Sequence, residues 1–195
     1  MTADHRLSSL WSDFNLMNLI IDPNPQNDQH SLNGALASRL AKALGGETKT
    51  IRIYDANQGY FNYQFEQNWI DLILESSNLI FPVPMWNYSI PASLKDFVDK
   101  TTKKGALWDF DDNRDYVGLL KNKAAFIIMT SGDVIPPGST DDFVTPYLKK
   151  VLVFWGVSKT KIYRLGGVRS KNLVTDNAFM DEKTTEMFHE FGLKT

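Results

Sequence analysis

The sequence predicts an α/β fold with a doubly wound, five-stranded parallel sheet. Short apolar runs alternate along the chain with stretches whose apolar residues recur every three to four positions, and this alternation is typical of parallel α/β sheets. The run at 124–129, AAFIIM, has no polar alternation, as expected of a central strand covered on both faces. A chain of 195 residues suits one core, so residues 1–195 are predicted to form a single domain.

The composition limits the classes of function. The formal net charge is -2 with both signs interspersed, so the sequence shows no electrostatic footprint for nucleic acid or an anionic membrane. The chain has no cysteine and its three histidines are scattered, so we expect neither thiolate catalysis nor a metal site. No apolar run approaches the roughly 20 residues of a membrane span. We therefore expect a soluble, cytoplasmic protein.

The first third of the chain contains two predicted strands with a helix between them. Residues 1–15 are expected to form an N-terminal arm, and 16–21, LMNLII, predict the first strand. After a polar loop, leucines spaced by four predict a helix that ends at Gly45-Gly46. Residues 50–54 alternate and contain β-branched side chains, which indicates an edge strand. A strand, a polar loop and a helix together form a unit that can bind phosphate at the helix N-terminus.

The stretch at 81–104 is the most informative one. A helix is expected at 65–76, and the apolar run at 79–81 then predicts a buried strand that stops before Pro82 and Pro84, because proline cannot donate a ladder hydrogen bond. Residues 85–88, MWNY, would form a loop at its carboxyl end, followed by a helix that opens with a proline. Ligands of open α/β sheets bind in the crevice outside the carboxyl ends of the strands. This loop is therefore a candidate platform for a flat ligand.

The same stretch resembles a known family. The pattern P-M-[YW]-N-[FY]-x-I-P-x-x-L-K-x-[FWY]-x-D, matched by residues 84–99, resembles the flavin-contacting segment of FMN-dependent NADH azoreductases and the related NAD(P)H:quinone reductases with flavodoxin-like folds. The resemblance implies a three-layer sandwich whose sheet has the strand order 2-1-3-4-5. The residues that it implies for flavin contact are Pro84, Met85, Trp86, Asn87 and Tyr88.

Two further segments carry the resemblance. Residues 31–36, SLNGAL, resemble the S-[FL]-N-x-A-[LM] of the quinone reductases, a segment that holds the flavin phosphate in that family. A serine or asparagine at this place can equally be a helix N-cap, and the two roles are compatible. Residues 130–133, TSGD, resemble the azoreductase loop T-S-x-G-G beside the polar edge of the flavin ring. The implied contacts are Ser31 and Asn33 for the phosphate, and Ser131 and Gly132 for the ring edge.

The last third predicts a helix with an unusually wide apolar face. Residues 139–142 offer a cap, and the apolar residues of 143–155 cover an arc of about 180°, beyond the roughly 100° that packing on one core needs. A second copy of the protein is expected to cover the remainder, because two-fold dimers are the commonest oligomers and the resembling families are dimers with flavin sites at the interface. A surface turn at 109–115, a strand at 161–165 and a closing helix at 178–191 complete the prediction.

Two functions follow from these patterns. The first is an FMN-dependent NAD(P)H oxidoreductase that reduces quinones or azo compounds by ping-pong hydride transfer, with NADH or NADPH as donor. No catalytic side chain is expected, because the cofactor performs the chemistry. The alternative is a flavodoxin-like dimeric regulatory or interaction module with weak or lost flavin binding. It is motivated by Asp22, where the resembling families have serine or histidine, by Asp133, where they have glycine, and by the segment after the second strand, which is shorter than in those families.

Overall fold

A five-stranded parallel sheet forms the middle layer of the protein, in the order β2-β1-β3-β6-β7. The computed structural model describes residues 16–25, 31–54, 64–169 and 173–193. Without the two short strands β4 and β5, this order is the predicted 2-1-3-4-5, so the predicted fold class is confirmed. The five strands are β1 (Met17–Asp22), β2 (Glu47–Arg52), β3 (Asn78–Pro84), β6 (Ala124–Thr130) and β7 (Lys159–Leu165).

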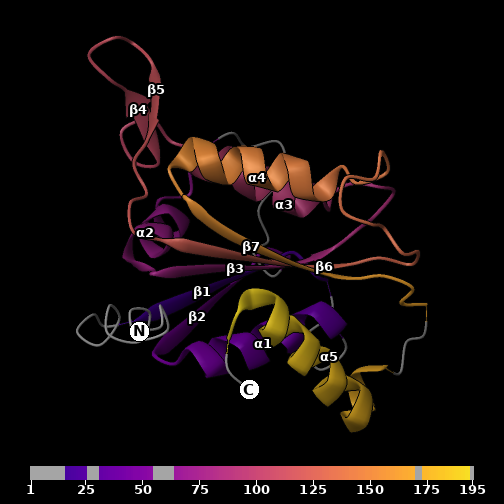
Figure 1. The fold of residues 1–195 in the computed structure, drawn as a ribbon. Helices are drawn as coiled ribbons and strands as arrows, with labels where there is room; N and C mark the ends of the chain where they lie inside the picture. The colour runs from indigo at the N-terminus through magenta and orange to yellow at the C-terminus, as the bar shows by residue number, and fades with distance from the viewer. Residues whose placement is uncertain (1–15, 26–30, 55–63, 170–172, 194–195) are drawn as a thin grey trace, which may run out of the picture.

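Helices cover both faces of the sheet (Figure 1). The helices α2 (Gln67–Glu75), α3 (Ala92–Thr101) and α4 (Val144–Trp155) pack on one face, in one apolar cluster. The helices α1 (Leu32–Leu44) and α5 (Asn177–Phe191), the latter preceded by the 3-10 turn η2 (Leu173–Thr175), pack on the other. Strands β3 and β6 contribute side chains to both clusters, which explains why their sequences lack alternation.

The third strand runs through its prolines, so the prediction that it stops before Pro82 is wrong. Strand β3 pairs with β6 as far as Pro84. Successive strand residues present their N–H groups to opposite sides, and the N–H of Met85 donates to the carbonyl of Thr130 at 2.8 Å. The nitrogens of both prolines therefore face the β1 side, where the pairing with β3 ends at Ile80. The N–H groups that the two prolines lack would therefore have no partner in the pairing of β1 with β3.

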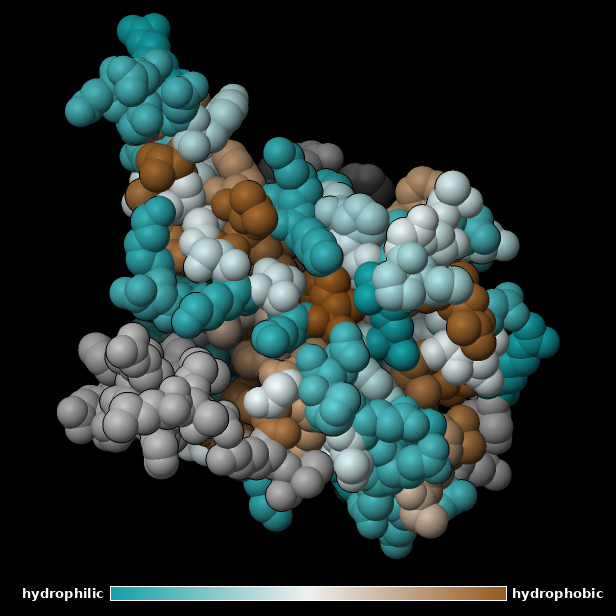
Figure 2. Space-filling view, in the orientation of Figure 1, coloured by the Kyte–Doolittle hydropathy of each residue, from teal (hydrophilic) through white to brown (hydrophobic). Residues whose placement is uncertain are grey.

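The surface turn predicted at 109–115 is the tip of a small hairpin, in which residues 111–115 form the exposed turn and 109–110 belong to the first strand. Strands β4 (Trp108–Phe110) and β5 (Tyr116–Gly118) pair antiparallel and project from the body of the protein (Figure 1). The ring of Trp108 lies 5.1 Å from that of Phe154 of α4, measured between centroids. In Figure 2 the tip of this arm is hydrophilic and hydrophobic residues gather at its base. Strands of three residues are too short to show a periodic pattern in the sequence.

Most other differences concern the ends of elements. Strand β2 begins at Glu47, before the predicted start at 50. The prediction missed its first residues because they are polar and mostly exposed, which hides the alternation of a strand. Over the described residues, none of the helices has the length and apolar character needed to cross a membrane. The predicted arm at 1–15 lies outside the described residues, and the assignment of the whole chain to one domain stays a prediction.

Candidate functional site

The predicted site residues come from three segments that meet at the carboxyl edge of the sheet: the start of α1, the end of β3 and the end of β6. A hollow of about 250 Å³ lies between these segments. Its lining residues are Asn24, Pro25, Ser31, Leu32, Asn33, Pro84, Trp86 and Thr130. The fold therefore brings together four of the predicted residues, namely Ser31, Asn33, Pro84 and Trp86, from segments more than 50 positions apart.

The start of α1 forms the polar end of the hollow. Ser31 is the N-cap, and its Oγ accepts a hydrogen bond from the N–H of Gly34 at 3.2 Å and donates to Asn33 Oδ1 at 2.5 Å. The Nδ2 of Asn33 is buried and has no hydrogen-bond partner within the described segments. A buried donor left without a partner costs about 1–3 kcal/mol. A donor of this kind, at a helix N-terminus whose dipole favours negative charge, fits the phosphate of a flavin nucleotide.

A tight turn after β3 forms the aromatic end. Trp86 and Ser89 exchange two backbone hydrogen bonds, of 3.0 and 3.1 Å. The two residues between them, Asn87 and Tyr88, have φ values of 50° and 68°, as a type I′ turn requires. The side chain of Trp86 lines the hollow and is 39% exposed. Positive φ is uncommon for residues other than glycine, so the turn holds Trp86 in place at some conformational cost.

The five residues predicted to hold the ring occupy different places. Pro84 and Trp86 line the hollow, whereas Met85 packs against the apolar cluster of α2, α3 and α4. Asn87 and Tyr88 are exposed at the tip of the turn and do not line the hollow. Their direct contact with a ligand stays a prediction.

The loop after β6 begins beside the hollow, but the predicted residues Ser131 and Gly132 do not line it. Thr130 belongs to the lining, and the next residue, Ser131, is buried. The N–H of Ser131 donates to the carbonyl of Leu165 at 3.1 Å, and its own carbonyl accepts from Val168 at 3.0 Å. Its hydroxyl donates to the carbonyl of Asp133 at 2.6 Å. All three polar groups of Ser131 thus hold the loop itself, so the serine positions its neighbours.

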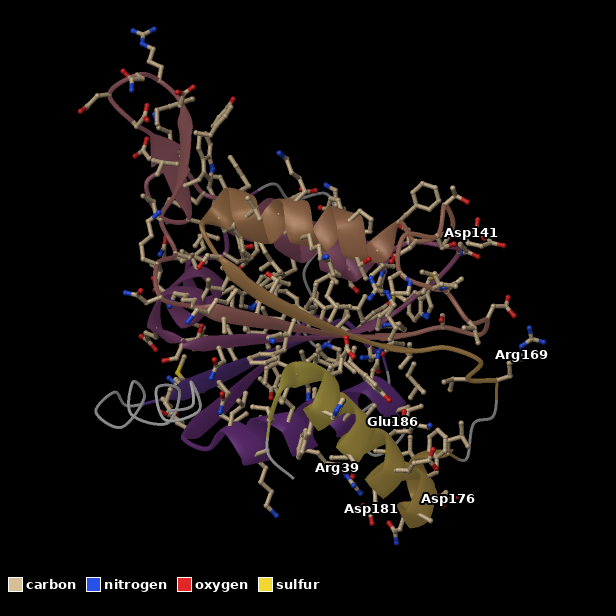
Figure 3. All side chains as sticks on the ribbon, viewed as in Figure 1. Arg39, Asp141, Arg169, Asp176, Asp181 and Glu186 are labelled. Carbon is tan, nitrogen blue, oxygen red and sulfur yellow. The ribbon has the colours of Figure 1, made fainter. Side chains whose placement is uncertain are left out.

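Asp133, which stands where the resembling families have glycine, is paired with an arginine. Arg169 forms an exposed ion pair with Asp133, and its Nε donates to the carbonyl of Gly132 at 3.1 Å. Figure 3 shows Arg169 at the outer edge of the protein, beyond the ends of β6 and β7. A Cβ at Gly132 would meet no atom within 4 Å, so this glycine leaves open space beside the loop. The charge of Asp133 is therefore balanced locally.

Asp22, which stands where the resembling families have serine or histidine, is buried. Its Oδ1 accepts hydrogen bonds from the backbone N–H of Asn24 at 2.9 Å and from Asn24 Nδ2 at 2.5 Å. The same Nδ2 lies 3.4 Å from the carbonyl of Pro82, and Ser93 Oγ of α3 donates to the carbonyl of Pro23 at 3.3 Å. These bonds fix the loop after β1 with its carboxylate turned inward, next to a lining residue of the hollow. A buried carboxylate near an anion site opposes the binding of a second anion.

Four residues of the lining were not predicted: Asn24, Pro25, Leu32 and Thr130. Thr130 was already part of the matched loop, and its position as the last residue of β6 could have marked it, because ligands of parallel sheets collect at strand ends. Asn24 and Pro25 belong to the polar loop after β1. This loop contains several amides and prolines, and the sequence does not show which of them line a site.

Comparisons with known proteins agree with this geometry. The sequence model of the family described as "Flavodoxin-like fold" matches residues 17–187. An FMN-dependent NADH:quinone oxidoreductase of Beijerinckia indica subsp. indica is 31% identical over 179 residues, which cover 90% of this chain and 82% of that protein. A protein of the same name from Alteromonas mediterranea is 32% identical over 158 residues, 78% of each chain.

The fold also matches solved structures. One is an FMN-dependent NADH-azoreductase from Bacillus anthracis str. Ames Ancestor in complex with FMN, with a TM-score of 0.67, 19% identity, and coverage of 89% of this chain and 98% of that one. An azoreductase from Bacillus anthracis str. Sterne gives a TM-score of 0.69 at 16% identity, with 88% and 98% covered. The fold, the matched motifs and the relatives above 30% identity agree. The chain belongs to the FMN-dependent NADH:quinone oxidoreductase family of flavodoxin-like oxidoreductases.

Proposed function

We propose that the protein is an FMN-dependent NAD(P)H oxidoreductase that reduces quinones or azo compounds. The observation that supports this best is the hollow itself, which has an unpartnered buried amide donor, Asn33 Nδ2, at a helix start and an aromatic side chain, Trp86, on its wall. An anionic tail and a flat ring joined in one molecule suit these two features. The names of the relatives add NADH as donor and a quinone as acceptor.

The chain's own part in this function is binding and orientation. Ser31 and Asn33 would hold the phosphate. The backbone of Gly132 would face the polar edge of the ring, and Ser131 would hold the loop in place there through its own hydrogen bonds. The segment assigned to the ring is Pro84, Met85, Trp86, Asn87 and Tyr88. FMN held there would supply the redox chemistry, two-electron transfer from a nicotinamide donor to an aromatic acceptor, and donor and acceptor would use the same slot in turn. A cytoplasmic location stays a prediction.

Titration with FMN followed by a steady-state assay tests the proposal. We expect the purified protein to quench FMN fluorescence with a stoichiometry of one per chain, and then to oxidise NADH in the presence of menadione. Initial rates at several quinone concentrations should give parallel double-reciprocal lines, because the two substrates bind in turn. A comparison of kcat/KM for NADPH with kcat/KM for NADH identifies the preferred donor. Free FMN with NADH and menadione is the control, and a rate no higher than this control would contradict the proposal.

The alternative function is a dimeric regulatory or interaction module with weak or lost flavin binding. The inward-facing carboxylate of Asp22 favours it, because this charge lies beside Asn24 in the wall of the hollow. The same titration separates the two functions. Fluorescence that stays unquenched at high protein concentration, in a well-folded protein, would support the module and exclude the enzyme.

We also propose that the protein is a homodimer that uses the outer face of α4. The hairpin arm of the same chain covers Phe154, so a second copy is needed for only part of the wide apolar face. Phe143 and Val153 remain 60% and 64% exposed. Phe143 is the N-cap of α4 and Val153 lies near its end, with the exposed Lys149 and Lys150 between them, so the surface left for a second copy is apolar at both ends and basic in the middle.

Val153→Glu is expected to convert the dimer to a monomer, because a carboxylate buried in the interface would lose its hydration. Sedimentation velocity at micromolar concentration measures this directly. Leu74→Glu, an equally drastic change at an exposed position of α2, is the matched control and should leave the dimer intact. A wild-type protein that sediments as a monomer, or a Val153→Glu variant that stays dimeric, would contradict the proposed interface.

A further inference from the structure

The last two residues of β7 hold opposite ends of the loop between β6 and α4. This loop, residues 131–143, is called the β6–α4 loop below. The carbonyl of Leu165 accepts from the N–H of Ser131 at the near end. The side chain of Arg164 reaches Asp142 and Thr145 at the far end, where α4 begins. One strand end therefore sets both anchors of a loop that borders the candidate site.

The far anchor is a compact, buried cluster. Arg164 Nη2 donates to Thr145 Oγ1 at 2.9 Å and lies 3.4 Å from Asp142 Oδ2. The side chains of Arg164 and Asp142 are only 19% and 2% exposed. Asp142 Oδ1 accepts from the backbone N–H of Thr145 at 2.8 Å, and its Oδ2 accepts from the Thr145 hydroxyl. Removing one member of a buried charged pair leaves the other uncompensated, so the cluster cannot lose its arginine without rearranging.

The carboxylate of this cluster is charged at neutral pH. Burial alone would raise the pKa of Asp142, but the hydroxyl and N–H of Thr145 and the guanidinium of Arg164 outweigh it and hold the pKa below its usual value. Both contacts of Arg164 come from one nitrogen, Nη2, which the guanidinium holds in a fixed plane, whereas a lysine carries its ammonium on a flexible stem. The cluster thus depends on the reach of this nitrogen from β7 to the start of α4.

The near end of the loop packs directly on the backbone that follows β7. A Cβ at Gly166 would lie 2.6 Å from the Cα of Val134 and 2.8 Å from the carbonyl oxygen of Asp133. The absence of a side chain there lets the loop and the end of β7 touch. A shift of β7 at residues 164–166 would therefore move residues 131–134 with it.

We propose that Arg164 is a positioning residue for the cofactor site. It ties the start of α4 to the end of β7, and so holds the β6–α4 loop, whose residues Ser131 and Gly132 directly follow Thr130 in the wall of the hollow. This inference rests on the proposed FMN function for its consequence, since that loop is assigned to the polar edge of the flavin ring. The competing interpretation is that Arg164 only stabilises α4.

Arginine variants separate these interpretations. Arg164→Met removes the charge and both contacts. Arg164→Lys keeps the charge but carries it on a flexible stem in place of the planar group. Thr145→Val removes only the hydroxyl that accepts from Arg164, for the case in which the first variant does not fold. Arg39→Met is the matched control, because Arg39 also joins two elements, α1 and α5, through its bond to Asp181 at 2.6 Å (Figure 3).

Two measurements are made on each variant. Amide hydrogen exchange in the absence of FMN reports the loop itself, and in Arg164→Met we expect exchange at Ser131 and Val168 to speed up at least tenfold. FMN titration should then show a dissociation constant raised at least tenfold and, at saturating FMN, a shifted visible spectrum of the bound flavin. Arg164→Lys and Thr145→Val should lie between this variant and wild type, and Arg39→Met should match wild type in both measurements.

The inference would be overturned if Arg164→Met or Thr145→Val lost stability while amide exchange at residues 131 and 168 and the flavin spectrum at saturation stayed unchanged. Arg164 would then only stabilise α4. A wild-type protein that binds no FMN would contradict the proposed function instead. In that case the exchange rates, which need no cofactor, still decide whether Arg164 holds the loop.

Discussion

Replacing Asn33 with aspartate is expected to weaken FMN binding at least about a hundredfold, which corresponds to about 2.8 kcal/mol. The change keeps Oδ1, with its bonds to Ser31 Oγ at 2.5 Å and to the Gly34 N–H at 3.0 Å. It replaces the unpartnered Nδ2 donor with a carboxylate oxygen that would face the proposed phosphate position. Two unit charges 4 Å apart interact by about 4 kcal/mol at an effective dielectric constant of 20, so repulsion alone can account for the loss.

Without FMN the Asn33→Asp variant should be less stable than wild type by about 1–3 kcal/mol, because a carboxylate oxygen without a partner takes the place of the amide at a position that is only 2% exposed, and the helix dipole offsets part of this cost. Riboflavin, which lacks the phosphate, should bind wild type and variant alike. Asn177→Asp, the same change at the first residue of α5, is the control and should leave FMN affinity unchanged. An equal loss for FMN and riboflavin, or no loss for either, would contradict the placement of the phosphate at Asn33.

Replacing Gly156 with alanine is expected to lower the free energy of unfolding by about 2–5 kcal/mol. This glycine ends α4 with φ of 99°, a left-handed conformation that costs other residues about 1–2 kcal/mol. A Cβ there would also lie 2.6 Å from the carbonyl carbon of Gly118 in β5, and overpacking of this kind costs about 1–3 kcal/mol. The join between the hairpin arm and α4 would have to open.

Urea unfolding of Gly156→Ala and Gly105→Ala separates the two contributions. Gly105 has φ of 78°, but a Cβ there would meet nothing within 4 Å, so its replacement incurs the conformational cost alone. We expect Gly156→Ala to be less stable than Gly105→Ala by about 1–3 kcal/mol. Equal losses would show that the contact between Gly118 and Gly156 adds nothing to stability.

The sheet could be predicted from the sequence because its central strands are buried on both faces. Continuous apolar runs at β1, β3 and β6 have no helical competitor of similar length, and the helices between them are marked by clear spacing. The hairpin of β4 and β5 could not be predicted. Its stability depends on ring contacts with Phe154, a residue far along the chain, and on strands too short to show a period. The same contacts cover part of the α4 face that pointed to a second copy.

The candidate site was predictable by segment but not side chain by side chain. The start of α1 could be recognised because a serine and an asparagine at a helix start follow a strand and a polar loop. The segment at 84–88 was recognised as a unit, yet Asn87 and Tyr88 lie outside the hollow, since positive φ at both residues turns the chain back on itself. No glycine marks this turn in the sequence. The continuation of β3 through two prolines likewise depends on where the partner strand ends.

A crystal structure of the protein grown with excess FMN would show where the cofactor binds. We expect the phosphate against Ser31 and Asn33 at the start of α1, with the ring against Trp86 and Thr130. A hollow without flavin, or one closed by the protein's own side chains, would contradict it.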